Sequence, residues 1–125
     1  MGRLTGPHSS YRKLHHRDTT HKPIAEVLES FGWTVIDTSA IGPQVPGFPD
    51  MMIGLGGVTD LVQAKTGEDA SFTPAEIEFA KNWRGRPIVN LVSTAAAIEW
   101  ATRTRHERHR QSALKAALAP CVHRG

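Results

Sequence analysis

The sequence predicts an α/β or α+β fold in which a mixed central sheet is flanked by helices. Three observations predict it: apolar residues recur at helical spacing, short runs are rich in β-forming residues, and glycine- or proline-rich segments separate the two kinds. The predicted order is helix, three strands, helix, strand, helix. At 125 residues the chain has the length of one domain with one modest core.

The first helix is expected to begin near Thr19 or Thr20, either of which can cap it, with Pro23 in its first turn. Its apolar stripe comprises Ile24, Val27, Leu28 and Phe31. Gly32 is expected to follow the helix as its C′ residue. Residues 33–36 then predict a strand, because tryptophan, threonine, valine and isoleucine all favour strands.

A loop dense in glycine and proline, residues 39–49, leads into a predicted hairpin. Residues 50–53 form its first strand, residues 54–57 its turn and residues 58–65 its second strand. The turn is favoured because two adjacent glycines accept the positive φ angles that a tight hairpin needs.

The second half of the chain opens on a capping box, residues 73–76, with proline at the first helical position. The apolar residues expected to turn this helix toward the core are Phe79, Ala80 and Trp83, with Ile77 at the edge of the stripe. A last strand is expected at residues 87–92. Ser93 or Thr94 can then cap a final alanine-rich helix from about Ala95.

The net charge of +3 is unevenly distributed. Residues 1–17 carry basic side chains and no acid, residues 103–125 are strongly basic, and the segment between them is acidic. The expected division is a flexible basic arm (1–17), a central folded domain (18–102) and a basic C-terminal helix or tail (103–125). Basic ends suit contact with a polyanion, although solvated tails explain them equally well.

Two further features limit the setting of the protein. No apolar run follows the first residues as in a secretory signal, and none is long enough to span a membrane. Cys121 is the only cysteine, which excludes an intramolecular disulfide and disfavours a thiolate zinc site. These features predict a protein of the reducing cytoplasm.

Three polar residues in and before the hairpin are candidates for chemistry. Side chains alternate along a strand, so Gln63 and Lys65 share one face while Val62 and Ala64 point to the other. The hairpin brings Asp50 near that face. Asp and Lys are rarely buried without a partner, so core packing explains this set poorly. The alternative is an exposed cross-strand salt bridge between Lys65 and Asp50.

Pro49-Asp50, followed by Gln63-Ala64-Lys65, resembles the PD-(D/E)xK nuclease superfamily, in particular its VRR-NUC or Holliday-junction-resolvase-like branch, often found in phage genomes. The resemblance covers roughly residues 20–100. It implies a restriction-endonuclease-like α-β-β-β-α-β core, which makes residues 18–102 a nuclease-like domain. It also implies a metal-dependent DNA endonuclease that works as a homodimer in a bacterial or phage-infected cell, and it allows selectivity for junctions or branched DNA.

The resemblance further implies the roles of the site residues. Asp50, the Gln63 side chain and the Ala64 backbone carbonyl would bind Mg²⁺ or Mn²⁺, and Lys65 would position the attacking water or stabilise the transition state. Gln63 departs from the family, in which most members carry Asp or Glu; its amide oxygen can still bind a hard cation. Family members often supply an acid from the first helix, and His21 stands at about that place.

Two other functions remain open at this point. One is a catalytically inactive DNA-binding module on the same fold, with Gln63 as the sign of lost hydrolysis. The other is a small α/β protein that binds a different phosphorylated ligand.

The basic residues expected to contact DNA phosphates are Arg12, Lys13, Arg17, Arg103, Arg105 and Arg108.

Overall fold

The computed structural model describes residues 21–65 and 71–122, without the side chains of residues 119–122. The predicted N-terminal arm lies outside the described residues. The elements, in order, are α1 (Lys22–Ser30), β1 (Thr34–Asp37), the 3₁₀ turn η1 (Ser39–Ile41), β2 (Met51–Leu55), β3 (Val58–Ala64), α2 (Pro74–Asn82), β4 (Val89–Leu91) and α3 (Thr94–Val122). The predicted order and the α+β class are confirmed.

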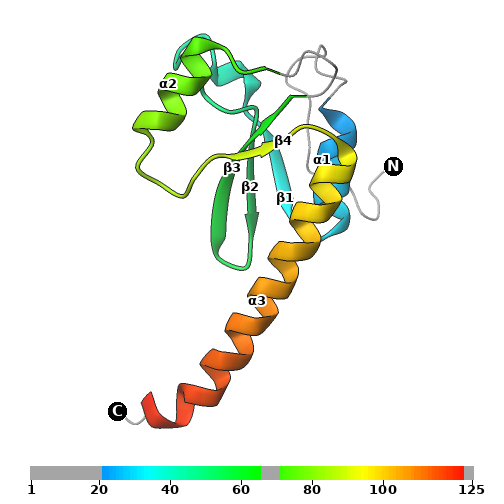
Figure 1. Cartoon of the computed structure of the whole chain (residues 1–125), viewed down its shortest axis with the longest axis vertical. Helices are drawn as coiled ribbons and strands as arrows, with labels where there is room; N and C mark the ends of the chain where they lie inside the picture. Colours follow the sequence, from blue (N-terminus) through cyan, green and yellow to red (C-terminus); the bar gives the residue numbers. More distant parts are fainter. Residues whose placement is uncertain (1–20, 66–70, 123–125) are drawn as a thin grey trace, which may run out of the picture.

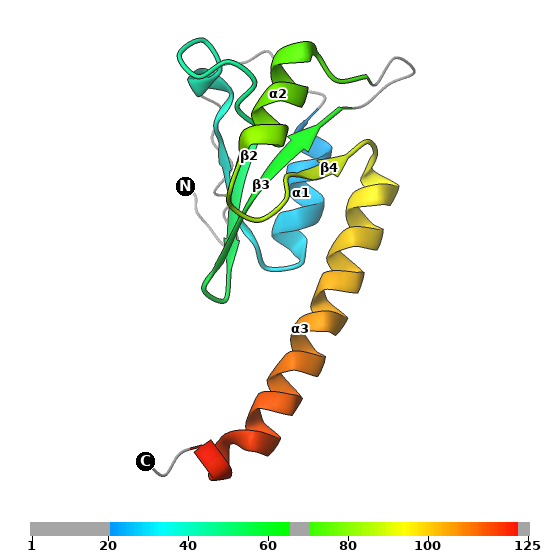
Figure 2. The ribbon, with the colours of Figure 1, turned by 60° about the vertical axis from the view of Figure 1, so that its left-hand side comes forward.

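The four strands form one mixed sheet in the order β1-β2-β3-β4. β1 and β2, and β2 and β3, pair antiparallel, whereas β4 runs parallel to β3. Helix α1 and the first part of α3 lie together on one side of this sheet, and α2 lies near the end of β3 on the other side (Figures 1 and 2). The sheet therefore has one face closed by two helices and one face that is more open.

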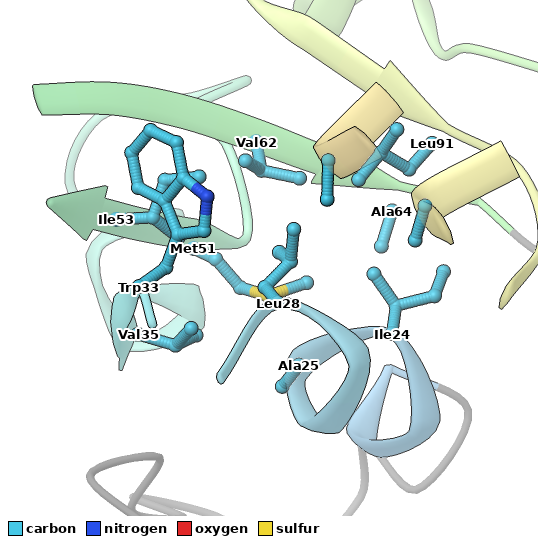
Figure 3. Packing of buried hydrophobic residues seen from close by; sticks show 12 residues of the cluster. Ile24, Ala25, Leu28, Trp33, Val35, Met51, Ile53, Val62, Ala64 and Leu91 are labelled. Carbon is cyan, nitrogen blue, oxygen red and sulfur yellow. The ribbon is translucent and has the colours of Figure 1, made fainter. Parts of the chain in front are cut away.

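The hydrophobic core fills the space between the sheet and the helices α1 and α3 (Figure 3). Its strand residues include Val62 and Ala64, which are buried on this face as the alternation predicts. Gln63 therefore points to the opposite, more open face. Other members of the core are Ile24, Leu28, Trp33, Val35, Met51, Ile53, Leu91, Ala97 and Ala101.

Helix α1 ends as predicted but begins differently. Gly32 has φ +99°, and the N–H groups of Gly32 and Trp33 donate to the carbonyls of Glu29 and Leu28 at 2.9 and 3.1 Å, which is a Schellman motif. The expected threonine cap is wrong: the N-cap residue is His21, and its side chain makes no capping hydrogen bond. Thr19 and Thr20 lie outside the described residues.

The hairpin turn is shorter than predicted, because strand pairing continues through Gly54 and Leu55. Only Gly56 and Gly57 turn, with φ of +59° and +83°, the positive angles that a two-residue type I′ turn requires. A side chain on Gly56 would also collide with the guanidinium of Arg108. This guanidinium donates to the Leu55 carbonyl at 3.2 Å and so ties α3 to the tip of the hairpin.

Helix α2 does not face the core, so the expected inward stripe is wrong. The helix buries no residue, and Ile77 and Trp83 are 57% and 41% exposed. The Phe79 ring instead packs edge-on against Phe48 and stacks on Trp83, each at a centroid distance of 5.4 Å. The apolar residues of α2 thus contact one another and the preceding loop, because the helix lies on the sheet face opposite the core.

Helix α3 is a single element of 29 residues that crosses the predicted boundary at residue 103 without a break. The Ser93 side chain accepts a hydrogen bond from the Ala96 N–H at 3.0 Å, which confirms the predicted cap. Beyond Arg108, which contacts the hairpin tip, the helix projects away from the sheet, with Leu114 and Leu118 exposed (Figure 1). None of the helices in the described part of the chain is long and apolar enough to cross a membrane.

One buried charge ties the loop before β4 to β3. The Asp60 side chain is 0% exposed, and its Oδ1 accepts a hydrogen bond from Arg86 Nε at 2.6 Å. This bond and the attraction of Asp60 raise the pKa of the Arg86 guanidinium above its usual value. Asp60 therefore depends on Arg86 for the compensation of its charge.

Replacing Arg86 by methionine is expected to lower the free energy of unfolding by about 2 kcal/mol, because Asp60 would stay buried without its partner. The expected loss of stability is smaller than for fully buried pairs, because the Arg86 side chain is 61% exposed and water can partly replace it. Urea denaturation measures the change. Arg84→Met, in the same exposed loop, serves as the control and should stay within about 0.5 kcal/mol of the wild type. Equal stability of the two variants would contradict the role of the pair.

Candidate functional site

The candidate site is built around Asp50, which directly precedes β2. Its backbone is fixed by Thr38, which donates its N–H to the Asp50 carbonyl and its hydroxyl to the Pro49 carbonyl, both at 2.8 Å. The Asp50 carboxylate then reaches β3. Its Oδ2 accepts the Gln63 side-chain amide at 3.0 Å and the Ala64 backbone N–H at 3.1 Å. The expected approach of Asp50 to β3 is therefore observed.

The structure adds an acid that the sequence did not single out. Glu76, in the first turn of α2, accepts the Gln63 amide on Oε2 at 3.0 Å and lies 2.9 Å from Lys65 Nζ through Oε1. The side chains of Lys65 and Glu76 are 23% and 16% exposed, so both are largely shielded from solvent. Lys65 thus pairs with Glu76, an acid of α2. The alternative raised by the sequence was a different pair, a salt bridge between Lys65 and Asp50.

In the sequence, the capping box alone already accounts for Glu76. Its Oε1 does accept the Thr73 N–H at 2.9 Å, and its own N–H donates to Thr73 Oγ1 at 3.2 Å. The cap fixes the orientation of the carboxylate, and the second oxygen remains available to Gln63. A usable signal was the short separation between Lys65 and the capping box, since a helix that starts soon after a strand can return its first turn over the strand end.

Gln63 joins the two acids through one nitrogen. The side chain is buried, and its NH₂ group donates one hydrogen bond to Asp50 and one to Glu76. An amide NH₂ carries two donors and no acceptor, so this orientation satisfies both carboxylates. Coordination of a cation by the amide oxygen of Gln63 would require rotation of the amide group about its Cγ–Cδ bond.

His21 lies at the same edge of the site, at the start of α1. Its Nε2 is 3.7 Å from Asp50 Oδ2, and its side chain is 14% exposed. This separation exceeds a hydrogen bond but allows attraction when the imidazole is protonated. His21 therefore borders the Asp50 carboxylate, and its role at a metal site stays a prediction.

The residues present fit a hard divalent cation only if water and substrate supply its remaining ligands. Within residues 21–65 and 71–122, no group of three or more His, Cys, Asp and Glu side chains lies close enough to hold a metal ion. The structure instead brings together two carboxylates and one amide that can present an oxygen, while the Ala64 N–H donates to Asp50. Binding of a cation by the Ala64 carbonyl stays a prediction. Mg²⁺ is commonly bound in this way, by one or two carboxylates with water and substrate phosphate as further ligands.

The basic residues of α3 predicted to contact DNA have partners within the protein. Arg103 lies 3.6 Å from Glu99, the Arg105 guanidinium lies 4.8 Å above the ring of Phe31, and Arg108 binds the hairpin tip. This stretch of α3 leads away from α2 and from the end of β3 (Figure 2). Contact with DNA through it stays a prediction. The other residues predicted for DNA binding, Arg12, Lys13 and Arg17, lie outside the described residues.

Comparison of the chain with family models, with characterised proteins and with solved structures finds no match. The resemblance to PD-(D/E)xK nucleases thus stays a prediction from the motif residues. The chemistry of the site is that of the cluster formed by Asp50, Gln63, Lys65 and Glu76.

Proposed function

We propose that the protein is a Mg²⁺- or Mn²⁺-dependent DNA endonuclease of the PD-(D/E)xK type. One observation carries the proposal: a single amide nitrogen of Gln63 lies 3.0 Å from carboxylate oxygens of both Asp50 and Glu76, and Lys65 Nζ lies 2.9 Å from Glu76. Two acids, an amide and an ammonium group therefore meet on the open face of the sheet. The homodimer and the preference for branched DNA are part of the proposal and come from the family resemblance.

Each residue of the cluster has a task in phosphodiester hydrolysis. Asp50 and Glu76 would bind the divalent cation, which supplies a more acidic bound water and offsets charge that develops on the phosphate. Gln63 holds the two acids at a fixed separation. Lys65 provides a compact positive charge for the phosphate oxygens, and its bond to Glu76 directs the ammonium group into the cluster.

Glu76 also bears on the choice between hydrolysis and simple DNA binding. Gln63 alone suggested a decayed site, because the family acid is missing on β3. Glu76 supplies a carboxylate 3.0 Å from the Gln63 amide, so the negative charge is present but comes from α2. A module that only binds DNA gains nothing from two carboxylates facing the phosphates, since like charges repel. This favours hydrolysis over binding alone.

The proposal is tested by incubating the purified protein with supercoiled plasmid and with a four-way DNA junction, in Mg²⁺, in Mn²⁺ and in EDTA. We expect nicked or cleaved products with either metal and intact DNA in EDTA. A protein that retards DNA in a gel but cuts neither substrate with any metal would be the DNA-binding module instead. A protein that neither binds nor cuts DNA would favour another phosphorylated ligand.

A further inference from the structure

Helix α2 stands off the sheet and leaves a cavity of about 320 Å³ between itself and the strands β3 and β4. Such a volume lies at the lower end of the range for small-ligand sites. The walls are mostly apolar. They are formed by Phe72, Ile77, Phe79 and Ile88, with Asn90 and Lys81 as polar members.

The cavity is continuous with the candidate site, because Gln63 and Glu76 line both. A chemical group in the cavity would therefore lie directly beside a phosphate held by the site. One wall is also held in place in advance: the Phe79 ring is fixed between Phe48 and Trp83, at 5.4 Å from each.

We propose that this cavity binds an unpaired nucleobase adjacent to the phosphate that is hydrolysed; the inference rests on the proposed nuclease function. A base has two flat apolar faces, which suit the Phe79 and Ile77 side of the cavity, and a polar edge, which suits the amide of Asn90. Lys81, an exposed residue of the same lining, is placed to meet a flanking phosphate.

The cavity would make the enzyme selective for DNA structure. A base within a duplex must leave its stack and its partner before it can enter, and this penalty is smallest for a base that is already unpaired. Flaps, gaps and frayed junctions would therefore bind better than continuous duplex. No sequence preference is needed for this selectivity, because every base has a face that can stack on an aromatic ring.

The test compares two dye-labelled flap duplexes that differ only at the unpaired nucleotides next to the branch, which carry either bases or abasic residues. Fluorescence anisotropy with wild-type protein in EDTA measures binding without hydrolysis. We expect the loss of the bases to weaken binding about tenfold, the usual order for one base stacked on an aromatic side chain. Equal affinity for the two duplexes would overturn the proposal.

Two variants then locate the effect. Ala80 lines the cavity and is exposed, so Ala80→Trp should fill the space and abolish the preference for bases while leaving abasic binding unchanged. Ala75→Trp places the same side chain on the same helix outside the cavity and should keep the preference. If Ala80→Trp fails to fold, Ile77→Ala, at a residue 57% exposed, should reduce the preference instead. Retention of the full preference by a folded cavity variant would overturn the proposed position of the base.

Failure of this inference differs from failure of the nuclease function. A protein that cuts DNA but binds both duplexes equally would remain a nuclease and would lack the base site. A protein that prefers bases but cuts no DNA would keep the base site and would be a binding module.

Discussion

Replacing Lys65 by alanine is expected to reduce the rate of metal-dependent DNA cleavage by at least about 100-fold. Lys65 brings its ammonium group into contact with the acids of the cluster, through its bond to Glu76 at 2.9 Å. Without it, charge that builds up on the phosphate loses a fixed positive neighbour. The Glu76 carboxylate would remain bonded to Gln63 and to the Thr73 N–H, so the local structure should persist.

Single-turnover cleavage rates measure this effect, and thermal unfolding tests the fold. Loss of the ion pair should lower the free energy of unfolding by about 2 kcal/mol, because both side chains are largely shielded from solvent while Glu76 keeps its bonds to Gln63 and Thr73. Lys22→Ala removes the same charge from an exposed residue of α1 and should cleave like the wild type. A folded Lys65→Ala protein with the wild-type rate would remove Lys65 from the mechanism.

The part of the site carried by the hairpin could be predicted from the sequence because strands impose a strict alternation. Val62 and Ala64 had to enter the core, and that placed Gln63 and Lys65 on the other face. The adjacent glycines fixed the hairpin that brings Asp50 alongside β3. These inferences needed only local geometry.

The part carried by α2 could not be predicted in the same way. A stripe such as Phe79 and Trp83 shows that a helix has an apolar side, but not which face of a sheet it will meet. The helix lies on the face opposite the core, where its aromatic residues pack on Phe48. The register of α2 over β3 decides that Glu76 contacts Gln63, and this register depends on tertiary packing.

The same limit applies to the basic residues of α3. Charge patterning identified Arg105 and Arg108 as candidates for DNA contact. In the structure Arg105 lies over Phe31 and Arg108 binds the Leu55 carbonyl, so both join α3 to the rest of the protein. A run of basic residues on a helix does not reveal which of its members have partners within the fold.

Replacing Glu76 by glutamine is expected to lower the cleavage rate on the order of 100-fold, because the site loses one of the two carboxylates proposed to bind the cation. Glutamine also serves at this position of a capping box, so α2 should keep its N-terminus. Cleavage should be measured over a range of Mn²⁺ concentrations, since loss of a ligand raises the concentration required. Glu78→Gln, two residues further along the helix and exposed, is the matched control and should behave like the wild type.

Exchanging the two side chains gives the sharper test of why Glu76 matters. The double variant Gln63→Glu/Glu76→Gln returns the acid to β3 and leaves the amide on α2. Residues 63 and 76 are in direct contact at 3.0 Å, so the carboxylate moves by little more than one hydrogen bond. If the site requires two acids around one cation, the double variant should recover much of the activity that Glu76→Gln loses. If it is as inactive as Glu76→Gln, the helix acid is needed for its bond to Lys65, and Gln63 is not standing in for a lost carboxylate.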